Sequence, residues 1–368
     1  MLKHQLVFIG TYTEPILFGT GKIFQGKGEG IYAYRFDESS RSMNLCSVTQ
    51  AGPNPSYLTF DPSHRFLYCV NELKEFEGAP TGAVSAFSIN SERGTLSLLN
   101  RQPSHGTDPC NLIVDKSGRY VIVANFGSGS VCVLPIQKDG SLGDPSDVIQ
   151  HHGSSIDPIR QIGPHAHGVT LDDSGLYVFV PDLGLDKLMV YKFDPDRGKL
   201  EPNETPWINI PASAGPRQLV FHPKGRYAYL INELNSTVMA FQYDGVHGSL
   251  RKLQILSTLP EEFKGNSSCG ELQISPSGKF LYGSNRGNDS IAIYSINHMD
   301  GMLSNIGFAS VEGKTPRHFI VDQEGEYLLV ANQDTDSVVA FSLDSESGGI
   351  KVTGNNTNVP TPACVKIL

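Results

Sequence analysis

The sequence predicts an all-β protein that folds as a seven-bladed β-propeller with four strands in each blade. One phrase recurs along the chain: a turn of the form Asp-x-Ser-Gly followed by an apolar run that ends in Asn, as in Asp115-Lys-Ser-Gly-Arg-Tyr-Val-Ile-Val-Ala-Asn125. Its seven copies end at positions 11, 71, 125, 182, 232, 285 and 332. Repeats of roughly 50 residues built from short β-type runs are typical of propeller blades. No stretch shows a sustained helical period, so few helices are expected.

Each repeat can be divided into four strands separated by turns. In the first complete repeat the strands are expected at residues 56–60, 66–71, 82–89 and 95–102. The first two runs are almost continuously apolar, as in strands that are buried on both faces, whereas the third alternates more clearly. Turn-forming residues at 91–94 and 138–140 mark reversals of the chain. One repeat therefore has the strand content of one blade.

The two ends of the chain predict how the ring closes. Residues 362–368 repeat the innermost-strand phrase found at 55–60 and 316–321, whereas the N-terminal region begins directly with a second strand. One C-terminal strand is therefore expected to join three N-terminal strands, near residues 6–11, 30–36 and 44–50, in a shared seventh blade. This arrangement covers the sheet edges at both ends of the chain. We expect residues 1–368 to form a single domain.

Composition excludes several function classes. The net charge of -9 and the pI of about 5.6 disfavour a nucleic-acid or anionic-membrane surface. The first apolar run is short and is broken by Gly10, so neither a signal peptide nor a membrane span is expected. The six cysteines form no CxxC pair, which favours reduced thiols in a cytoplasmic protein. We expect a monomer or a weak homodimer.

Charged residues break the repeat at the inner strands. In a propeller these strands begin at the mouth of the central channel. Aligning the repeats puts seven residues at one equivalent position: Ser56, Cys110, His167, Arg217, Gly270, Arg317 and Ala363. The next position holds Tyr57, Asn111, Gly168, Gln218, Glu271, His318 and Cys364. A purely structural repeat would favour similar small or apolar residues in every blade. The basic and acidic residues instead fall in blades three to six, which predicts a site for an anionic ligand.

The ends of the second strands add to this cluster. Glu72 and Glu233 each follow the repeated Asn, Arg286 follows Asn285, and Asp182 replaces the Asn. A carboxylate beside Arg and His residues could act as a general acid or base, while the guanidinium groups stabilise an oxyanion. The repeated Asn residues themselves are expected to make structural hydrogen bonds from side chain to backbone.

No cofactor or metal site is expected from the motifs. His165 and His167 lie two residues apart and would share one face of a strand, which suits a metal ion. A third ligand at metal-binding spacing is not evident, however. The sequence also contains no GxSxG, HExxH or Walker phosphate-loop motif.

Several motifs resemble those of the lactonase family of seven-bladed propellers. They are spread in order along essentially the whole chain and include Gly10-Thr-Tyr-Thr13, Gly163-Pro-His-Ala-His167, Gly215-Pro-Arg217, Asn232-Glu-Leu234 and Ser284-Asn-Arg-Gly287. This family includes the cycloisomerase-like 6-phosphogluconolactonases and the fungal carboxymuconate cyclases. The resemblance to the cyclase branch implies a site of one His, two Arg and one Glu. The His falls on His167, one Arg on Arg217 and the Glu on Glu233, and the second Arg falls on Arg286 or Arg317.

The leading hypothesis is therefore a lactone hydrolase, with 6-phosphogluconolactone as the substrate that the resemblance favours and carbohydrate metabolism, through the pentose phosphate pathway, as its setting. The expected catalytic residues are His167, Arg217, Glu233 and Arg286, and Glu233 is expected to activate water with help from His167. The expected substrate-binding residues are His165, Glu72, Asp182, Glu271, Arg317 and His318. Two extra stretches, residues 15–28 and 75–80, are expected to reshape substrate choice. A muconate-type lactonising cycloisomerase, which would act on an anionic carboxylate, and a non-enzymatic binding platform are the alternatives.

Overall fold

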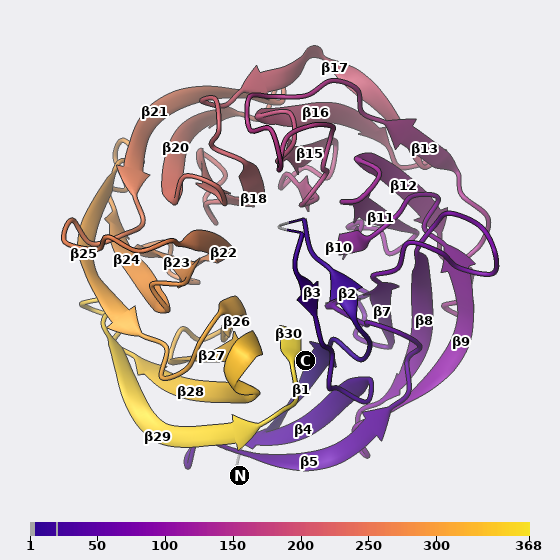
Figure 1. The fold of residues 1–368 in the computed structure, drawn as a ribbon, viewed down its shortest axis with the longest axis horizontal. Coiled ribbons are helices and arrows are strands. Elements are labelled where there is room, and N and C mark those ends of the chain that lie inside the picture. Colours follow the sequence, from indigo (N-terminus) through magenta and orange to yellow (C-terminus); the bar gives the residue numbers. More distant parts are fainter. Residues whose placement is uncertain (1–3, 20) are drawn as a thin grey trace.

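The protein folds as a ring of seven four-stranded antiparallel sheets (Figure 1). The computed structural model describes residues 4–19 and 21–368. In each of the first six blades the chain runs from the strand nearest the central axis to the outermost strand. The first six blades are, in order, β6 (Tyr57–Phe60), β7 (Phe66–Asn71), β8 (Ala83–Asn90) and β9 (Thr95–Pro103); β10 (Pro109–Val114), β11 (Tyr120–Asn125), β12 (Ser130–Pro135) and β13 (Asp147–Gln150); β14 (Thr170–Leu171), β15 (Tyr177–Asp182), β16 (Lys187–Asp194) and β17 (Lys199–Asn209); β18 (Pro216–Phe221), β19 (Tyr227–Asn232), β20 (Thr237–Asp244) and β21 (Ser249–Ser257); β22 (Ser268–Ile274), β23 (Phe280–Arg286), β24 (Ser290–Ile296) and β25 (Leu303–Ser310); and β26 (Pro316–Val321), β27 (Tyr327–Asn332), β28 (Ser337–Leu343) and β29 (Ile350–Asn358).

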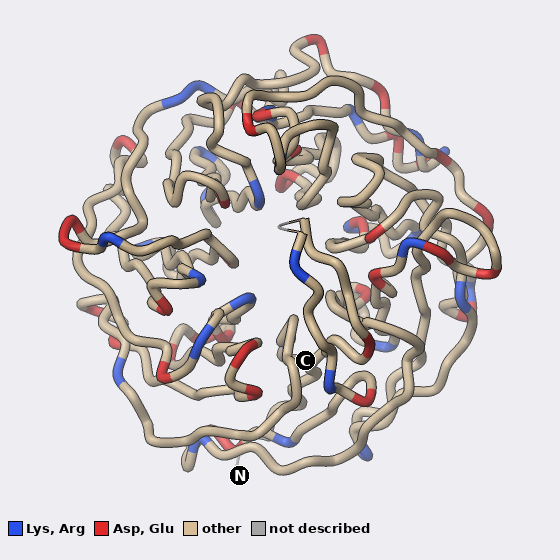
Figure 2. The backbone as a smooth tube through the Cα atoms, viewed as in Figure 1, with Lys and Arg blue, Asp and Glu red and all other residues tan. Residues whose placement is uncertain are grey.

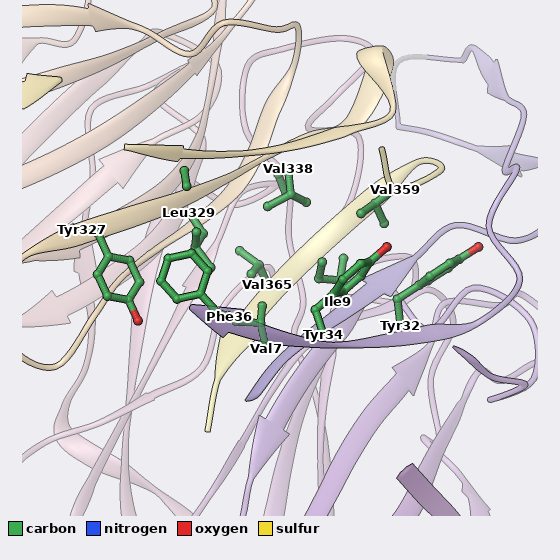
Figure 3. Close-up of a cluster of buried hydrophobic side chains, with 12 residues drawn as sticks. Val7, Ile9, Tyr32, Tyr34, Phe36, Tyr327, Leu329, Val338, Val359 and Val365 are labelled. Carbon is green, nitrogen blue, oxygen red and sulfur yellow. The ribbon is translucent and has the colours of Figure 1, made fainter. Parts of the chain in front are cut away.

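The seventh blade confirms the predicted closure, because it combines both ends of the chain. Its strands are β30 (Pro362–Ile367), β1 (His4–Thr11), β4 (Ile31–Asp37) and β5 (Ser42–Thr49). In the pairing of β1 with β30, Val7 lies opposite Ile367 and Ile9 opposite Val365. The side chains of Val7, Ile9 and Val365 then pack against Leu329 and Val338 of the sixth blade (Figure 3). A cluster of this kind lies between every two neighbouring blades. The hydrophobic core of the ring is therefore distributed over seven interfaces.

The repeated Asp-x-Ser-Gly phrase forms the turn between the first and second strands of a blade. In the second blade Asp115 Oδ2 accepts the N–H of Ser117, while Oδ1 accepts those of Arg119 and Tyr120 at 2.7 Å each. Gly118 has a φ of 70°, a left-handed conformation that glycine adopts without steric cost. The Asp carboxylate thus accepts hydrogen bonds from backbone N–H groups that would otherwise have no partner in the turn. This requirement explains why the phrase recurs.

The repeated Asn residues make the structural hydrogen bonds that were expected of them. The side-chain amides of Asn125, Asn285 and Asn332 donate to backbone carbonyls of Ser104, Thr258 and Val311, respectively. Each of these bonds ties the end of a second strand to the segment that precedes its blade. The Asn232 amide differs, because it donates to the hydroxyl of Thr237.

An additional hairpin lies over the central opening of the ring (Figure 1). It consists of β2 (Ile16–Leu17) and β3 (Ile23–Phe24) and occupies the extra stretch at residues 15–28. The rings of Phe18 and Phe24 stack on each other at 5.4 Å, and both pack edge-on against Tyr12. This aromatic cluster anchors the hairpin to the end of β1.

Apart from the strands, the described residues contain one short 3-10 helix, η1 (Gln333–Thr335), as the periodicity predicted. All six cysteines are free thiols, and only Cys46 is not buried. None of the helical segments in the described part of the chain is long and apolar enough to cross a membrane.

Candidate active site

A cavity of about 720 Å³ opens at the mouth of the central channel. The hairpin forms one wall through Leu17, Phe18, Ile23 and Phe24, and Phe126 and Ile159 add further apolar surface. Basic positions surround the central opening on the inner ends of several blades (Figure 2). The charged and imidazole side chains that line the cavity are Lys22, Glu72, Lys74, Asp108, Arg160, His165, His167, Glu233, Arg286, Arg317 and Asp334. The cavity thus combines apolar walls with an ionic floor.

A β-bulge in the inner strands directs side chains into the channel. In the fourth blade Pro216 pairs with Asn232 and Gln218 with Ile231, so Arg217 is left without a partner in the ladder. The same irregularity occurs at the equivalent positions of the second, fifth, sixth and seventh blades. A bulge residue turns its side chain away from the pleat of the sheet. The aligned ring positions Ser56, Cys110, His167, Arg217, Arg317 and Ala363 line one small cavity of about 10 Å³, which shares Cys110, His167 and Arg317 with the large one.

Glu233 lies at the centre of the ionic floor. Its carboxylate contacts Arg286 Nη2 at 2.7 Å, Arg160 Nη2 at 2.8 Å and Arg217 Nη1 at 3.5 Å. Burial alone would raise the pKa of Glu233, but the positive charges of Arg286, Arg160 and Arg217 outweigh it and hold this pKa well below its usual value. Glu233 is therefore ionised, and one carboxylate holds three guanidinium groups together.

His167 lies beside Arg217 in the same cluster. Arg217 Nη1 approaches both ring nitrogens, with Nδ1 at 3.1 Å, and Arg217 Nε donates to the carbonyl of Gly270 at 2.7 Å. Burial, reinforced by the positive charge of Arg217, keeps the pKa of His167 well below its usual value. The imidazole is therefore neutral at physiological pH, while its Nε2 lies 3.6 Å from the Glu233 carboxylate.

The structure separates the two arginines that the sequence left as alternatives. Arg286 contacts Glu233 and also donates to the carbonyl of Cys269, and burial lowers its pKa to about 10. Arg317 instead lies over the rings of Tyr12 and Phe18, with its central carbon 5.1 and 5.3 Å from their centroids. Among the described residues it has no hydrogen-bond acceptor and no ion-pair partner. Its donors are therefore available to a ligand.

Glu72 forms part of the cavity wall near Arg317. It is 7% exposed, and its Oε2 accepts hydrogen bonds from Tyr12 Oη at 2.9 Å and Ser56 Oγ at 2.5 Å. Burial raises the pKa of Glu72, although Arg317 and the two hydroxyl donors oppose this rise. Glu72 and Glu233 are therefore two carboxylates of the cavity in contrasting environments.

Other predicted site residues lie lower in the channel, at the rim or outside the site. Glu271 and His318 line the small cavity, where His318 Nε2 lies 3.6 Å from the Glu271 carboxylate. His165 is on the rim, where its ring stacks on Phe126 at 4.5 Å. Asp182 lines neither cavity, because its carboxylate is fully buried and accepts His151 Nδ1 at 2.6 Å together with three backbone N–H groups. Here the Asp serves the structural purpose of the repeated Asn.

Arg160 completes the site and was missed from the sequence. It belongs to the long segment between β13 and β14, where Asp157 Oδ1 accepts the N–H groups of Ile159 and Arg160 and closes a turn. This segment has no counterpart in the repeat, so aligning the blades could not place Arg160 near Glu233. The unusual length of the segment was the available signal.

Residues 75–80, by contrast, do not line the cavity. In the described ranges no group of three His, Cys, Asp or Glu side chains is arranged to hold a metal ion.

A model of the lactonase seven-bladed β-propeller family matches residues 6–367. The chain belongs to this family. It is 34% identical to the 6-phosphogluconolactonase of Bacillus subtilis over 98% of this chain and 97% of that protein. It is 32% identical to the 6-phosphogluconolactonase of Formosa agariphila, with 94% of each chain covered. Among solved structures, the periplasmic gluconolactonase of Pseudomonas aeruginosa superposes with a TM-score of 0.91 at 34% identity and covers 100% of this chain and 99% of that one. The family and the lactone-hydrolase class predicted from the sequence are confirmed.

Proposed function

We propose that the protein hydrolyses 6-phosphogluconolactone to 6-phosphogluconate at the mouth of the central channel. The observation that carries this proposal is the cluster of four arginines at the channel mouth, in which a single carboxylate, Glu233, makes all of the ion pairs. Three arginines share Glu233, and Arg317 has no partner among the described residues. A phosphorylated lactone supplies the missing negative charge, and its ester carbonyl needs the oxyanion stabilisation that buried arginines provide. The names of the Bacillus and Formosa relatives support the same substrate.

In this proposal the arginines share two tasks. Arg317, which lines the cavity and has no ion-pair partner among the described residues, binds the phosphate group. Arg217 and Arg286 polarise the lactone carbonyl and stabilise the oxyanion that forms when water attacks. Glu233 keeps these guanidinium groups in place. Because the pKa of Glu233 is held so low, this carboxylate is a weak proton acceptor, and its positioning role outweighs the water-activating role first expected of it. Neutral His167 holds the attacking water or the leaving ring oxygen by a hydrogen bond.

The remaining expected site residues are assigned to the surroundings of the substrate. His165 borders the cavity, and Glu271 and His318 support the channel below it. We further propose a cytoplasmic protein that acts as a monomer or weak homodimer without nucleic-acid or membrane partners. The acidic net charge of -9 and the free thiols favour this setting. Light scattering of the purified protein measures the oligomeric state.

The proposal is tested by adding the purified protein to freshly prepared 6-phosphogluconolactone and following ring opening by NMR against the spontaneous rate. Parallel reactions contain unphosphorylated gluconolactone or a carboxylated muconate. Acceleration confined to the phosphorylated lactone supports the proposal. Conversion of the muconate alone would replace it with the cycloisomerase function, and no conversion of any of the three would favour a binding platform.

Replacing Arg317 with glutamine is expected to weaken binding of the phosphorylated lactone specifically. A hydrogen bond to a charged group contributes about 1.5–3 kcal/mol, so KM should rise between about tenfold and a hundredfold. The KM for unphosphorylated gluconolactone should change by less than about twofold. Lys74→Gln is the matched control, because Lys74 also lines the cavity but is paired with Asp108 at 2.7 Å. Equal losses with both lactones would show that Arg317 does not bind the phosphate.

A further inference from the structure

Glu72 and Glu233, two of the carboxylates that line the cavity, differ in their capacity to accept a proton. Glu233 is surrounded by three guanidinium groups within 3.5 Å, which stabilise its negative charge. Glu72 has no ion pair within the described residues, and its hydrogen-bond donors are two neutral hydroxyl groups. Where two carboxyl groups of one site have such contrasting surroundings, the environment separates their acid–base roles. The following inference rests on the proposed lactone hydrolysis and concerns the group that activates water.

The geometry of Glu72 suits a proton acceptor. The residue directly follows β7 and lines the large cavity. Both hydroxyl donors, Tyr12 Oη and Ser56 Oγ, bind the same carboxylate oxygen, Oε2. The second oxygen, Oε1, receives no hydrogen bond from any residue that the structure describes. Tyr12 is a dependable donor, because burial keeps its pKa well above the usual value and the phenol stays protonated. Two fixed donors thus orient the carboxylate and leave one oxygen for a water molecule.

We propose that Glu72 is the general base that activates the hydrolytic water. Oε1 takes a proton from water as the water oxygen bonds to the lactone carbonyl carbon, and the carbonyl electron pair moves onto its oxygen beside the arginines. When this pair re-forms the C=O bond, the bond from the carbonyl carbon to the ring oxygen breaks. The ring oxygen then receives the proton from Glu72. Lactone and water become a hydroxy acid, which ionises and releases one proton to solvent.

The neighbours of Glu72 agree with this role. Arg317 is close enough to interact with the carboxylate, and Asp108 and Cys110 also lie in this part of the wall. Burial raises the pKa of Glu72 despite Arg317, whereas the pKa of Glu233 is lowered, so Glu72 is the stronger base of the two. A phosphate bound to Arg317 would further increase the proton affinity of Glu72 by offsetting the positive charge beside it.

The test is Glu72→Gln, which retains an oxygen acceptor for Tyr12 and Ser56 but cannot take a proton. General-base catalysis typically contributes about 10²–10⁴-fold, so kcat for the phosphorylated lactone should fall by at least about a hundredfold with little change in KM. In the wild type, kcat/KM should decrease as pH falls through the raised pKa of Glu72, and Glu72→Gln should lose this acidic limb. Asp108→Asn is the matched control, because Asp108 also lines the cavity but is paired with Lys74.

A purely structural role for Glu72 makes a different prediction. If Glu72 were only structural, the Glu72→Gln variant would have a lower melting temperature and a higher KM, and the acidic limb of its pH profile would persist. Near-wild-type kcat, or retention of that limb in Glu72→Gln and its loss in Glu233→Gln, would overturn the inference. If the wild type hydrolyses no lactone, the proposed function itself fails and this assignment fails with it. An active wild type with an unaffected Glu72→Gln variant would refute only the assignment of the base.

Discussion

Replacing Glu233 with glutamine is expected to lower both turnover and stability more than any other single change in the cavity. The carboxylate is buried and contacts Arg160, Arg217 and Arg286. Removing one partner of a buried ionic cluster leaves uncompensated charge, which typically costs about 3–5 kcal/mol. The guanidinium groups should then separate, and the loss of oxyanion stabilisation should reduce kcat by about a hundredfold or more. Denaturant unfolding and initial rates on the phosphorylated lactone measure the two effects.

An added anion distinguishes charge imbalance from general misfolding in this variant. The product 6-phosphogluconate should raise the melting temperature of Glu233→Gln by more than that of the wild type, because it supplies the missing negative charge. Glu75→Gln, in an exposed loop, is the control and should match the wild type in stability and rate. If the free energy of unfolding of Glu233→Gln lies within about 0.5 kcal/mol of the wild-type value and its hydrolysis rate is unchanged, Glu233 does not hold the three arginines in place.

The stability difference between the wild type and Glu233→Gln is expected to depend on pH. The folded-state pKa of Glu233 lies below its unfolded-state value, so its contribution is complete above the unfolded pKa. This contribution is lost as pH falls through the lower folded-state pKa. The difference in unfolding free energy between wild type and Glu233→Gln should therefore be constant above about pH 5 and shrink at more acidic pH. A difference that instead grew on acidification would contradict the ionised state assigned to Glu233.

Most of the fold could be predicted from the sequence because each blade repeats the same local hydrogen bonds. The turn phrase recurs because Asp115 and its equivalents bind the same backbone N–H groups, and the Asn at the strand end recurs because it binds a backbone carbonyl. Both requirements act within one blade or between adjacent blades, so they leave a periodic trace. The similarity of residues 362–367 to the other inner strands likewise predicted the pairing of β30 with β1.

The candidate site was less predictable because it departs from the repeat. Alignment placed His167, Arg217 and Arg317 at one ring position, but the β-bulge that turns Arg217 and Arg317 into the channel depends on the pairing register. Arg160 comes from a segment that has no equivalent in other blades. Asp182 was predicted to bind substrate because it is a carboxylate at the end of a second strand, yet it is buried against His151, which gives it a structural partner. Charge alone could not separate these cases.

Deleting residues 362–368 is expected to destabilise the protein far more than its length suggests. The deletion removes β30, exposes the inner edge of β1 and takes Val365 and Cys364, both fully buried, out of the core clusters on either side of the seventh blade. Burial of such side chains contributes about 1.5–3 kcal/mol each, and an unpaired strand edge adds to the loss. The melting temperature should fall by at least about 5 °C.

The comparison for this deletion is removal of residues 75–80, a largely exposed loop that pairs only Phe76 with Ala79. Thermal melts at equal concentration should show the loop deletion within a few degrees of the parent. If the tail deletion does not fold, Val365→Ala provides a milder variant of the same strand. Its free energy of unfolding should fall by about 1–3 kcal/mol because the shorter side chain leaves a cavity. A single cooperative transition in the parent would also support one domain over residues 1–368. If the tail deletion melted within about a degree of the parent, β30 would not close the ring, and the position of every channel residue would need to be reassigned.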